Sequence, residues 1–335
     1  MKHLWTGAQR ALLTGTITIL WTSCGSSSPT AATTSGTNTG ATPTGTAGAS
    51  LADGYRQAKW QPGVTVSFTG SCTMTYTSTG SPSHGQAAYY LVPNPAAQTV
   101  ATTPTGHLAL SVGTVPVSSK TTTYTMNVCP TKSAAGTTTR LGSAGWTISG
   151  AAMFNAYEGD NVTIANADNV SYNFVDANGA AQTAAFLDSC NGHQTPTPSN
   201  VYHYHGYSPC LATVAGDGAN GASHIVGIAL DGFPIYGDRD LSGNLVSIAQ
   251  LDECNGITSA TPEFPNGVYH YVLPSGAATK TAQAAPRCYK GTVSGALQLS
   301  VLMSGAQCVT PVTSAATSTV AKIAAGRIRS LTRPT

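Results

Sequence analysis

The chain of 335 residues has little charge: Asp, Glu, Lys and Arg make up 8% of it, and the net charge is +2. A nucleic-acid-binding protein needs a strongly basic surface, so the composition excludes that class of partner. No apolar run reaches the roughly 20 residues that a membrane-spanning helix requires. The sequence patterns of α/β-hydrolases, P-loop nucleotide binders and His-Glu-x-x-His metalloproteases are missing. Cys-x-x-Cys pairs are also missing, which argues against a cysteine-based zinc site.

The first 24 residues are typical of a bacterial export signal. Lys2 and Arg10 accompany an apolar stretch, residues 11–20, of the length found in signal peptides. Small residues then precede Cys24 in a way that resembles a bacterial lipobox, where the cysteine is acylated. We predict a lipoprotein signal peptide over residues 1–23 and a lipid on Cys24 as the membrane attachment, at the outer membrane or cell surface of the bacterial envelope. The alternative is a secretory signal that leaves Cys24 as a thiol or disulfide partner.

The two flanks of the chain have compositions typical of disordered segments. Residues 24–60 are rich in Ser, Thr, Gly and Ala with few large apolar side chains, so they predict a disordered tether. Residues 293–335 are predicted to hold one strand, Leu297–Met303, and then a basic disordered tail. The folded part is therefore expected as one domain over residues 61–292.

Between the flanks, β-branched and aromatic residues gather in short runs that are bounded by Gly, Pro and Asn. This pattern is typical of strands, whereas helical periodicity is nearly absent. Strands are expected at Val64–Phe68, Ala88–Val92, His107–Val112, Thr123–Val128, Trp146–Ser149 and Ile225–Ala229. The predicted fold is mainly β: a single, disulfide-braced, largely antiparallel β domain with long loops.

An internal repeat runs through the second half of this domain. Leu187–Gly192 reads Leu-Asp-Ser-Cys-Asn-Gly, and Leu251–Gly256 reads Leu-Asp-Glu-Cys-Asn-Gly. Each is followed by a Val-Tyr-His-Tyr segment, at Val201–Tyr204 and at Val268–Tyr271. We interpret this LD-x-C-N-G…VYHY pattern as a duplicated unit.

Seven cysteines follow Cys24, and in an oxidising compartment most of them should be paired. Each copy of the repeat is followed by a further cysteine, which favours one disulfide per copy, and the two earliest of the seven would form a third. The predicted pairs are Cys190–Cys210, Cys254–Cys288 and Cys72–Cys129. The sequence alone leaves this connectivity open, and Cys308 has no assigned partner.

The strongest chemical pattern is Tyr202-His203-Tyr204-His205. Alternate side chains of a strand point to one face, so His203 and His205 would present two imidazoles together. His193 lies upstream, and the predicted Cys190–Cys210 disulfide would hold it nearby. Three neutral imidazoles suit zinc or copper, and the exported setting and nearby tyrosines favour copper. The alternative is that these histidines bond to loop carbonyls and brace the fold.

Other side chains can support or complete this site. Tyr202 and Tyr204 face the other side of the strand and are expected to pack there rather than to serve in redox chemistry. Asp231 lies in an Asp-Gly turn, and it can either hydrogen-bond to a ligating imidazole or simply form the turn. His224, just before an apolar run, is either a further ligand or a strand-edge histidine.

From about Val64 to Thr292, the chain resembles the bacterial YHYH domain, which is named for the motif at residues 202–205. The likeness extends over several further segments. They are Ser78–His84, Trp146–Gly150, Asp188–His193, Gly227 with Asp231–Gly237, Leu251–Gly256 and Val268–Tyr271.

The resemblance implies an exported domain without an established activity. It also implies that His84 is a candidate ligand, because this residue matches a histidine common in the early turn of the family. The second repeat of the family usually keeps its own terminal histidines. Here Ile257 and Val272 take those positions and leave only His270, so a second complete site is not expected.

These observations favour a surface-anchored protein that binds a transition metal, copper before zinc, through its histidines. Two other classes of function stay open. The same histidines and tyrosines could line a groove for envelope polysaccharide or for a partner protein. Carboxylates such as Asp188 and Asp231 could instead serve a hydrolase. The sequence does not decide whether the protein catalyses a reaction.

Overall fold

The computed structural model of the chain describes residues 50–92, 99–102, 109–114, 121–195 and 199–294. The predicted signal peptide, Cys24, the strand predicted at Leu297–Met303 and Cys308 lie outside the described residues. Among the residues described, no helix has both the length and the apolar character needed to cross a bilayer.

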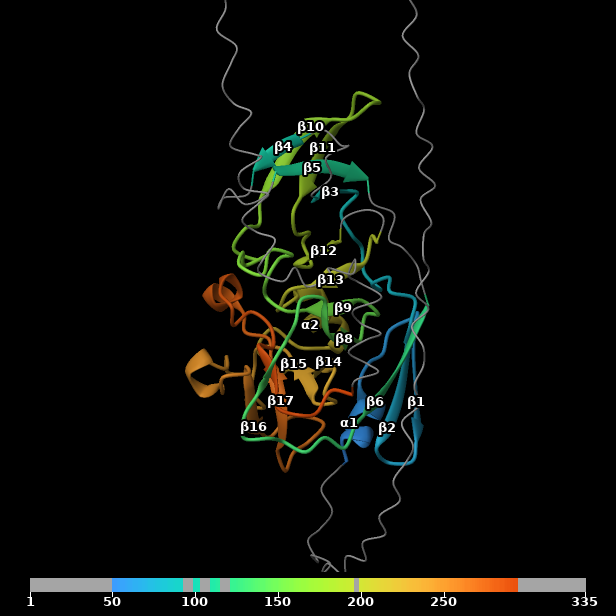
Figure 1. Cartoon of the computed structure of the whole chain (residues 1–335), viewed down its shortest axis with the longest axis vertical. Helices are drawn as coiled ribbons and strands as arrows, with labels where there is room; N and C mark the ends of the chain where they lie inside the picture. Colours follow the sequence, from blue (N-terminus) through green and yellow to red (C-terminus); the bar gives the residue numbers. More distant parts are fainter. Residues whose placement is uncertain (1–49, 93–98, 103–108, 115–120, 196–198, 295–335) are drawn as a thin grey trace, which may run out of the picture. The chain divides into compact units, whose positions relative to one another are not determined.

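The fold is mainly β, as the sequence predicts, and its largest sheet has eight strands (Figure 1). Their order is β12 (Gly192–Gln194), β13 (Tyr202–Tyr204), β9 (Ala152–Phe154), β8 (Ser143–Thr147), β14 (Ile225–Ala229), β15 (Pro234–Tyr236), β17 (Val268–Val272) and β16 (Gly256–Ser259). The pairings are antiparallel except β13 with β9 and β15 with β17. The two ends of the sheet therefore have the same arrangement of strand pairings. At each end, an outer antiparallel hairpin from one copy of the repeat is joined through a parallel pairing to an inner antiparallel hairpin.

A separate antiparallel sheet consists of β1 (Val64–Thr69), β2 (Thr73–Ser78) and β6 (Thr122–Asn127). Alternate residues of β2 and β6 are the more buried ones, as expected for strands with one face on a core. The buried Tyr76 and Tyr124 stack on Trp146 of β8, with ring centroids 6.1 and 4.2 Å away. Aromatic rings therefore join this sheet to the eight-stranded one.

The remaining strands form a five-stranded sheet and a two-stranded ribbon. The five-stranded sheet has the order β10 (Ser171–Val175), β11 (Ala181–Ala185), β3 (Tyr89–Val92), β5 (Ala109–Thr114) and β4 (Thr99–Thr102). It has a small hydrophobic core of its own, which includes Leu91, Leu110 and Phe186. The ribbon pairs β18 (Cys288–Tyr289) with β7 (Thr137–Thr138).

The predicted strands are found close to their expected positions. Five of the predicted strands begin and end within two residues of the prediction. They are β1, β3, β5, β6 and β14. The exception was expected at Trp146–Ser149 and instead ends at Thr147, as part of β8. The chain turns immediately afterwards, at Gly150, whose φ of +100° favours glycine.

The prediction of disorder over residues 24–60 is wrong for its last part, because Leu51–Gln57 form helix α1; residues 24–49 lie outside the described residues. The Ser50 hydroxyl accepts from the backbone N–H of Asp53 (3.3 Å), and the Asp53 carboxylate accepts from that of Ser50 (3.2 Å), which is a capping box. Tyr55 is fully buried and donates to the carbonyl oxygen of Gly232 (2.8 Å). The other helices are short: α2 (Pro209–Ala215), η1 (Ile248–Gln250) and η2 (Gly276–Lys280).

The three predicted disulfides are present: Cys72–Cys129, Cys190–Cys210 and Cys254–Cys288. Their sequence separations are 57, 20 and 34 residues, for which loop closure in the unfolded chain predicts a stabilisation of about 3–4 kcal/mol each. Each of the last two ties the turn before an outer hairpin to the chain that follows this hairpin. The ends of both outer hairpins are thus covalently fixed.

Candidate metal centre

The hairpin of β12 and β13 brings together the histidine cluster, which consists of His193, His203 and His205. The antiparallel register places His193 opposite His203, so their side chains lie on the same face of the hairpin. His205 follows His203 by two residues and shares that face. The sequence prediction that these three side chains meet is therefore supported by the geometry.

The turn before β12 is held by the carboxylate of Asp188. Its Oδ1 accepts hydrogen bonds from the backbone N–H groups of Cys190 (2.8 Å) and Gly192 (3.2 Å). Its Oδ2 accepts from the hydroxyls of Tyr90 (2.6 Å) and Tyr202 (2.8 Å). Asp188 is thus a structural anchor whose oxygens are fully engaged, which does not suit the role of a hydrolytic carboxylate.

Three Nε2 atoms converge in the histidine cluster. The Nε2 of His205 lies 3.1 Å from that of His193 and 3.0 Å from that of His203. His193, His203 and His205 are only 7%, 3% and 2% exposed. One ligand atom from each lies within 4.8 Å of the others, so a single ion could contact all three.

Backbone carbonyls fix the tautomers of two of these rings. The Nδ1 of His203 lies 3.0 Å from the oxygen of Val201, and that of His205 lies 2.6 Å from the oxygen of Asn155. A carbonyl only accepts, so Nδ1 carries the proton in both rings and the Nε2 lone pair of each neutral ring is bare. Two bare nitrogens 3.0 Å apart repel each other unless a cation lies between them. The Nδ1 of His193 is buried without a hydrogen-bond partner among the described residues.

Burial keeps the cluster uncharged. Desolvation is the largest cause that lowers the pKa of each imidazole, to about 4 for His205 and well below 6.5 for His193 and His203. Neighbouring imidazoles lower the pKa of the latter two further, because adjacent imidazolium ions would repel. A proton is therefore not the shared cation at neutral pH, and three buried neutral nitrogen donors fit a transition-metal ion.

Aromatic rings and one amide enclose the cluster. The ring of Phe154 stacks on His203 with centroids 3.8 Å apart, and Phe186 meets His193 edge-on at 4.5 Å. The side-chain amide of Asn166 donates to the backbone oxygen of His205 (3.2 Å). The aromatic contacts restrict the ring orientations of His203 and His193, and the amide restrains the backbone at His205.

His84 lies outside the histidine cluster, although the family resemblance proposed it as a ligand. Its Nδ1 is 2.8 Å from the oxygen of Gly85, so Nδ1–H donates there and Nε2 accepts from the hydroxyl of Tyr204. Tyr204 points away from the cluster, as strand alternation predicts. The sulfurs of Cys190 and Cys210 also lie near His84, but they are bonded to each other and offer no thiolate.

His224 and Asp231 also belong to other networks. The Nδ1 of His224 pairs with the carboxylate of Glu263 at 2.8 Å. Asp231 Oδ2 accepts from the hydroxyl of Tyr271 (2.6 Å) and from the backbone N–H of Gly291 (2.7 Å). Asp231 therefore braces the second copy of the repeat and touches no imidazole of the cluster, because it lies in the turn between β14 and β15.

The second outer hairpin repeats these supports without the cluster. His270 lies opposite Ile257, and its Nδ1–H donates to the oxygen of Val268 (3.1 Å), as His203 donates to Val201. Val272 takes the position that His205 has in the first hairpin. One imidazole therefore remains at this end of the sheet, in agreement with the sequence.

A family model described as YHYH protein matches residues 123–246 and 239–291. The chain belongs to the YHYH protein family. The matched residues include the whole histidine cluster and both outer hairpins of the eight-stranded sheet. No curated protein and no solved structure gives a significant match.

Several residues that shape the centre were not predicted from the sequence. The carbonyl of Asn155 orients His205, and Phe154 covers His203. A backbone carbonyl leaves no signal in the side-chain pattern. Phe154 lies on β9, whose parallel pairing with β13 joins segments far apart in the chain. Glu263 was missed as well, since only the folded chain brings it to His224.

Proposed function

We propose that this YHYH domain binds one transition-metal ion through His193, His203 and His205, with copper preferred to zinc. The observation that supports the proposal is the convergence of three buried imidazole Nε2 atoms on rings whose low pKa values keep them uncharged at neutral pH. A bound cation would relieve the repulsion between the Nε2 lone pairs of His203 and His205. A bound metal would supply Lewis-acid or redox chemistry there. The proposal itself is limited to metal binding.

The preference for copper over zinc rests on the proposed export and on the tyrosines beside the cluster, because the nitrogen spacing suits both metals. With metal–nitrogen bonds of about 2.0–2.1 Å, two neighbouring ligands are about 2.9 Å apart in tetragonal coordination and about 3.3 Å apart in tetrahedral coordination. The distances from His205 to the other two rings, 3.0 and 3.1 Å, lie between these two values and suit either geometry.

The proposed setting is the bacterial cell envelope, with the domain held by a lipid on Cys24 or otherwise secreted. The three disulfides are consistent with an oxidising compartment. Metabolic labelling with a fatty-acid analogue tests the anchor: label should enter the wild-type protein and not the Cys24→Ala variant. Equal labelling of the two would contradict acylation at this residue.

Metal content tests the main proposal. Protein exported by its own signal should contain about one copper or zinc ion per chain, and the His203→Ala, His205→Ala double variant should contain none. His270→Ala is the matched control, because it removes the equivalent imidazole from the other outer hairpin and should retain the metal. Acid should release the ion, since protons compete for the imidazoles.

Two results would contradict the proposal. One is a wild-type protein that is isolated without metal and takes up neither copper nor zinc at neutral pH. The other is equal metal content in the double variant and in His270→Ala, which would place the ion elsewhere. Copper and zinc offered together at equal concentration test the preference, which fails if zinc predominates.

A further inference from the structure

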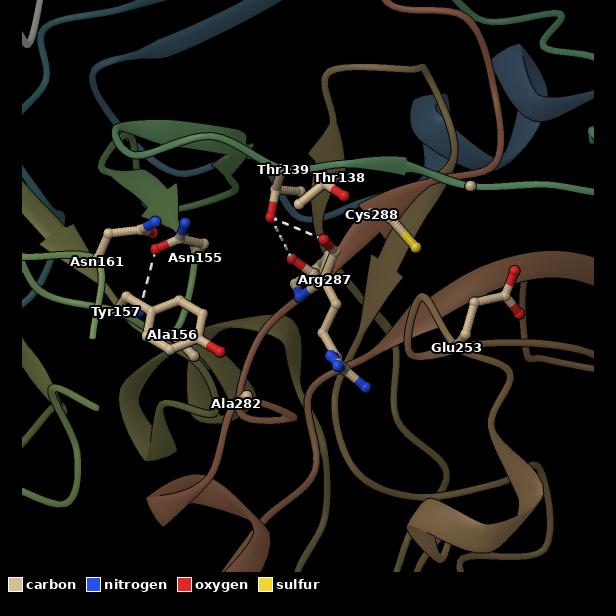
Figure 2. A pocket seen from close by; sticks show the side chains of 12 residues that line it. Thr138, Thr139, Asn155, Ala156, Tyr157, Asn161, Glu253, Ala282, Arg287 and Cys288 are labelled. Atoms are coloured by element: carbon tan, nitrogen blue, oxygen red, sulfur yellow. Dashed lines mark hydrogen bonds between the residues drawn. The ribbon is translucent and has the colours of Figure 1, made fainter. Parts of the chain in front are cut away.

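A cavity of about 480 Å³ opens beside the ribbon of β7 and β18, within the range of roughly 300–1,000 Å³ typical of small-ligand pockets. Three segments, around residues 136–139, 155–161 and 282–288, line it together with Glu253. In the view of Figure 2, the side chain of Arg287 extends between Tyr157 on the left and Glu253 on the right. The cavity is thus bounded by chain segments that the fold brings together from distant positions.

The backbone around Arg287 is firmly held. The backbone N–H of Thr139 (3.0 Å) and the Thr139 hydroxyl (3.0 Å) both donate to the carbonyl oxygen of Arg287. The next residue, Cys288, is fixed by its disulfide with Cys254. The base of the arginine side chain is therefore positioned by strand pairing and by a covalent bond, and only its exposed arm can adjust.

Four polar groups on the cavity wall have no hydrogen-bond partner among the described residues: the guanidinium of Arg287, the hydroxyls of Tyr157 and Thr138, and the side-chain amide of Asn161. The other polar groups are engaged. The amide of Asn155 donates to the oxygen of Arg140 (3.2 Å), and the Glu253 carboxylate is paired with Lys290. The guanidinium is consequently the charge that the cavity has available for a ligand.

We propose that this cavity binds a small polar molecule through a carboxylate group. A guanidinium presents its N–H donors in a planar fork that matches the two oxygens of a carboxylate, and such bidentate pairs are strong and directional. The free hydroxyl of Tyr157 and the amide of Asn161 can bind polar groups on the rest of the molecule. Asn155 forms part of the same wall while its carbonyl orients His205, so the ligand would lie next to the histidine cluster.

Calorimetric titration of the metal-stripped full chain tests this site independently of the metal. The probes are D-glucuronate, glucose 6-phosphate and D-glucose, which share a sugar body and differ in the charged group. Glucuronate should bind at least tenfold more tightly than either other sugar. Arg287→Gln should weaken glucuronate binding at least tenfold and still fold, because the arginine side chain has no partner among the described residues. Retention of the three disulfides checks the fold.

Lys280→Gln is the matched control: it removes one exposed positive charge that does not line the cavity, and binding should stay unchanged. Equal weakening by both variants would overturn the proposal, because the effect would then be one of net charge. Absence of glucuronate binding would also overturn it. Glucose 6-phosphate binding as tightly as glucuronate would overturn the assignment to a carboxylate.

Discussion

His270 should make the stability of the protein depend on pH through a residue that lies outside the metal centre. It is 4% exposed, and desolvation lowers its pKa to about 4, although the Val268 carbonyl and the Glu263 charge partly oppose the shift. In the unfolded chain its pKa should return to about 6.5. Because the unfolded chain then binds the proton more readily, acid favours unfolding. The stability that this neutral ring allows above pH 6.5 is lost as the pH falls toward 4.

The expected size follows from this shift. One pKa unit corresponds to about 1.4 kcal/mol, and integration from about pH 7 to about pH 4.5 gives a loss of about 2 kcal/mol from His270 alone. Urea unfolding of metal-free protein at both pH values, for wild type and His270→Gln, measures it. The histidine cluster is common to both proteins, so its own titration cancels in the difference. The wild type should lose about 2 kcal/mol more than the variant, and equal losses would refute the reasoning.

Two further variants test the support of the first outer hairpin by urea unfolding at neutral pH. Asp188→Asn should lower the free energy of unfolding by about 2–3 kcal/mol. The reason is that an amide nitrogen replaces an oxygen that accepts from Tyr90 and Tyr202 or from the turn. A change below about 0.5 kcal/mol would show that the carboxylate is dispensable. Gly192→Ala should also destabilise, since its Cβ would lie 2.3 Å from the Tyr202 hydroxyl oxygen, whereas Gly159→Ala meets nothing within 4 Å and should not. Equal stability of the two alanine variants would contradict the tight packing at Gly192.

The strands and disulfides could be predicted from the sequence because their signals are local or repeated. Alternation marks β6 as half-buried, and the repeat suggests one disulfide for each outer hairpin. Sheet order carries no such signal, since the parallel pairing of β13 with β9 joins distant segments. Helix α1 was missed because its seven residues, from Leu51 to Gln57, are too few to show helical periodicity.

The histidine cluster could be predicted in part for the same reason. His203 and His205 share a strand face by alternation, and the disulfide at Cys190 places His193 near them. The faces on which His84 and His224 lie depend on tertiary contacts, which a single sequence does not reveal. Alternation predicts only that Tyr204 points away from the cluster; that His84 hydrogen-bonds to its hydroxyl is known from the structure alone.

The two outer hairpins bear on the alternative that the histidines only brace the fold. Both hairpins have an anchoring aspartate that accepts from a tyrosine, a disulfide and a histidine bonded through Nδ1 to a carbonyl. The second forms the same antiparallel ladder with Ile257 and Val272 where the first has His193 and His205. Aliphatic side chains therefore suffice to build this hairpin, and they avoid the free-energy cost of burying polar imidazoles. The buried imidazoles of His193 and His205 therefore cost stability that the hairpin does not require. This cost favours ion binding, rather than bracing of the fold, as the reason for their presence.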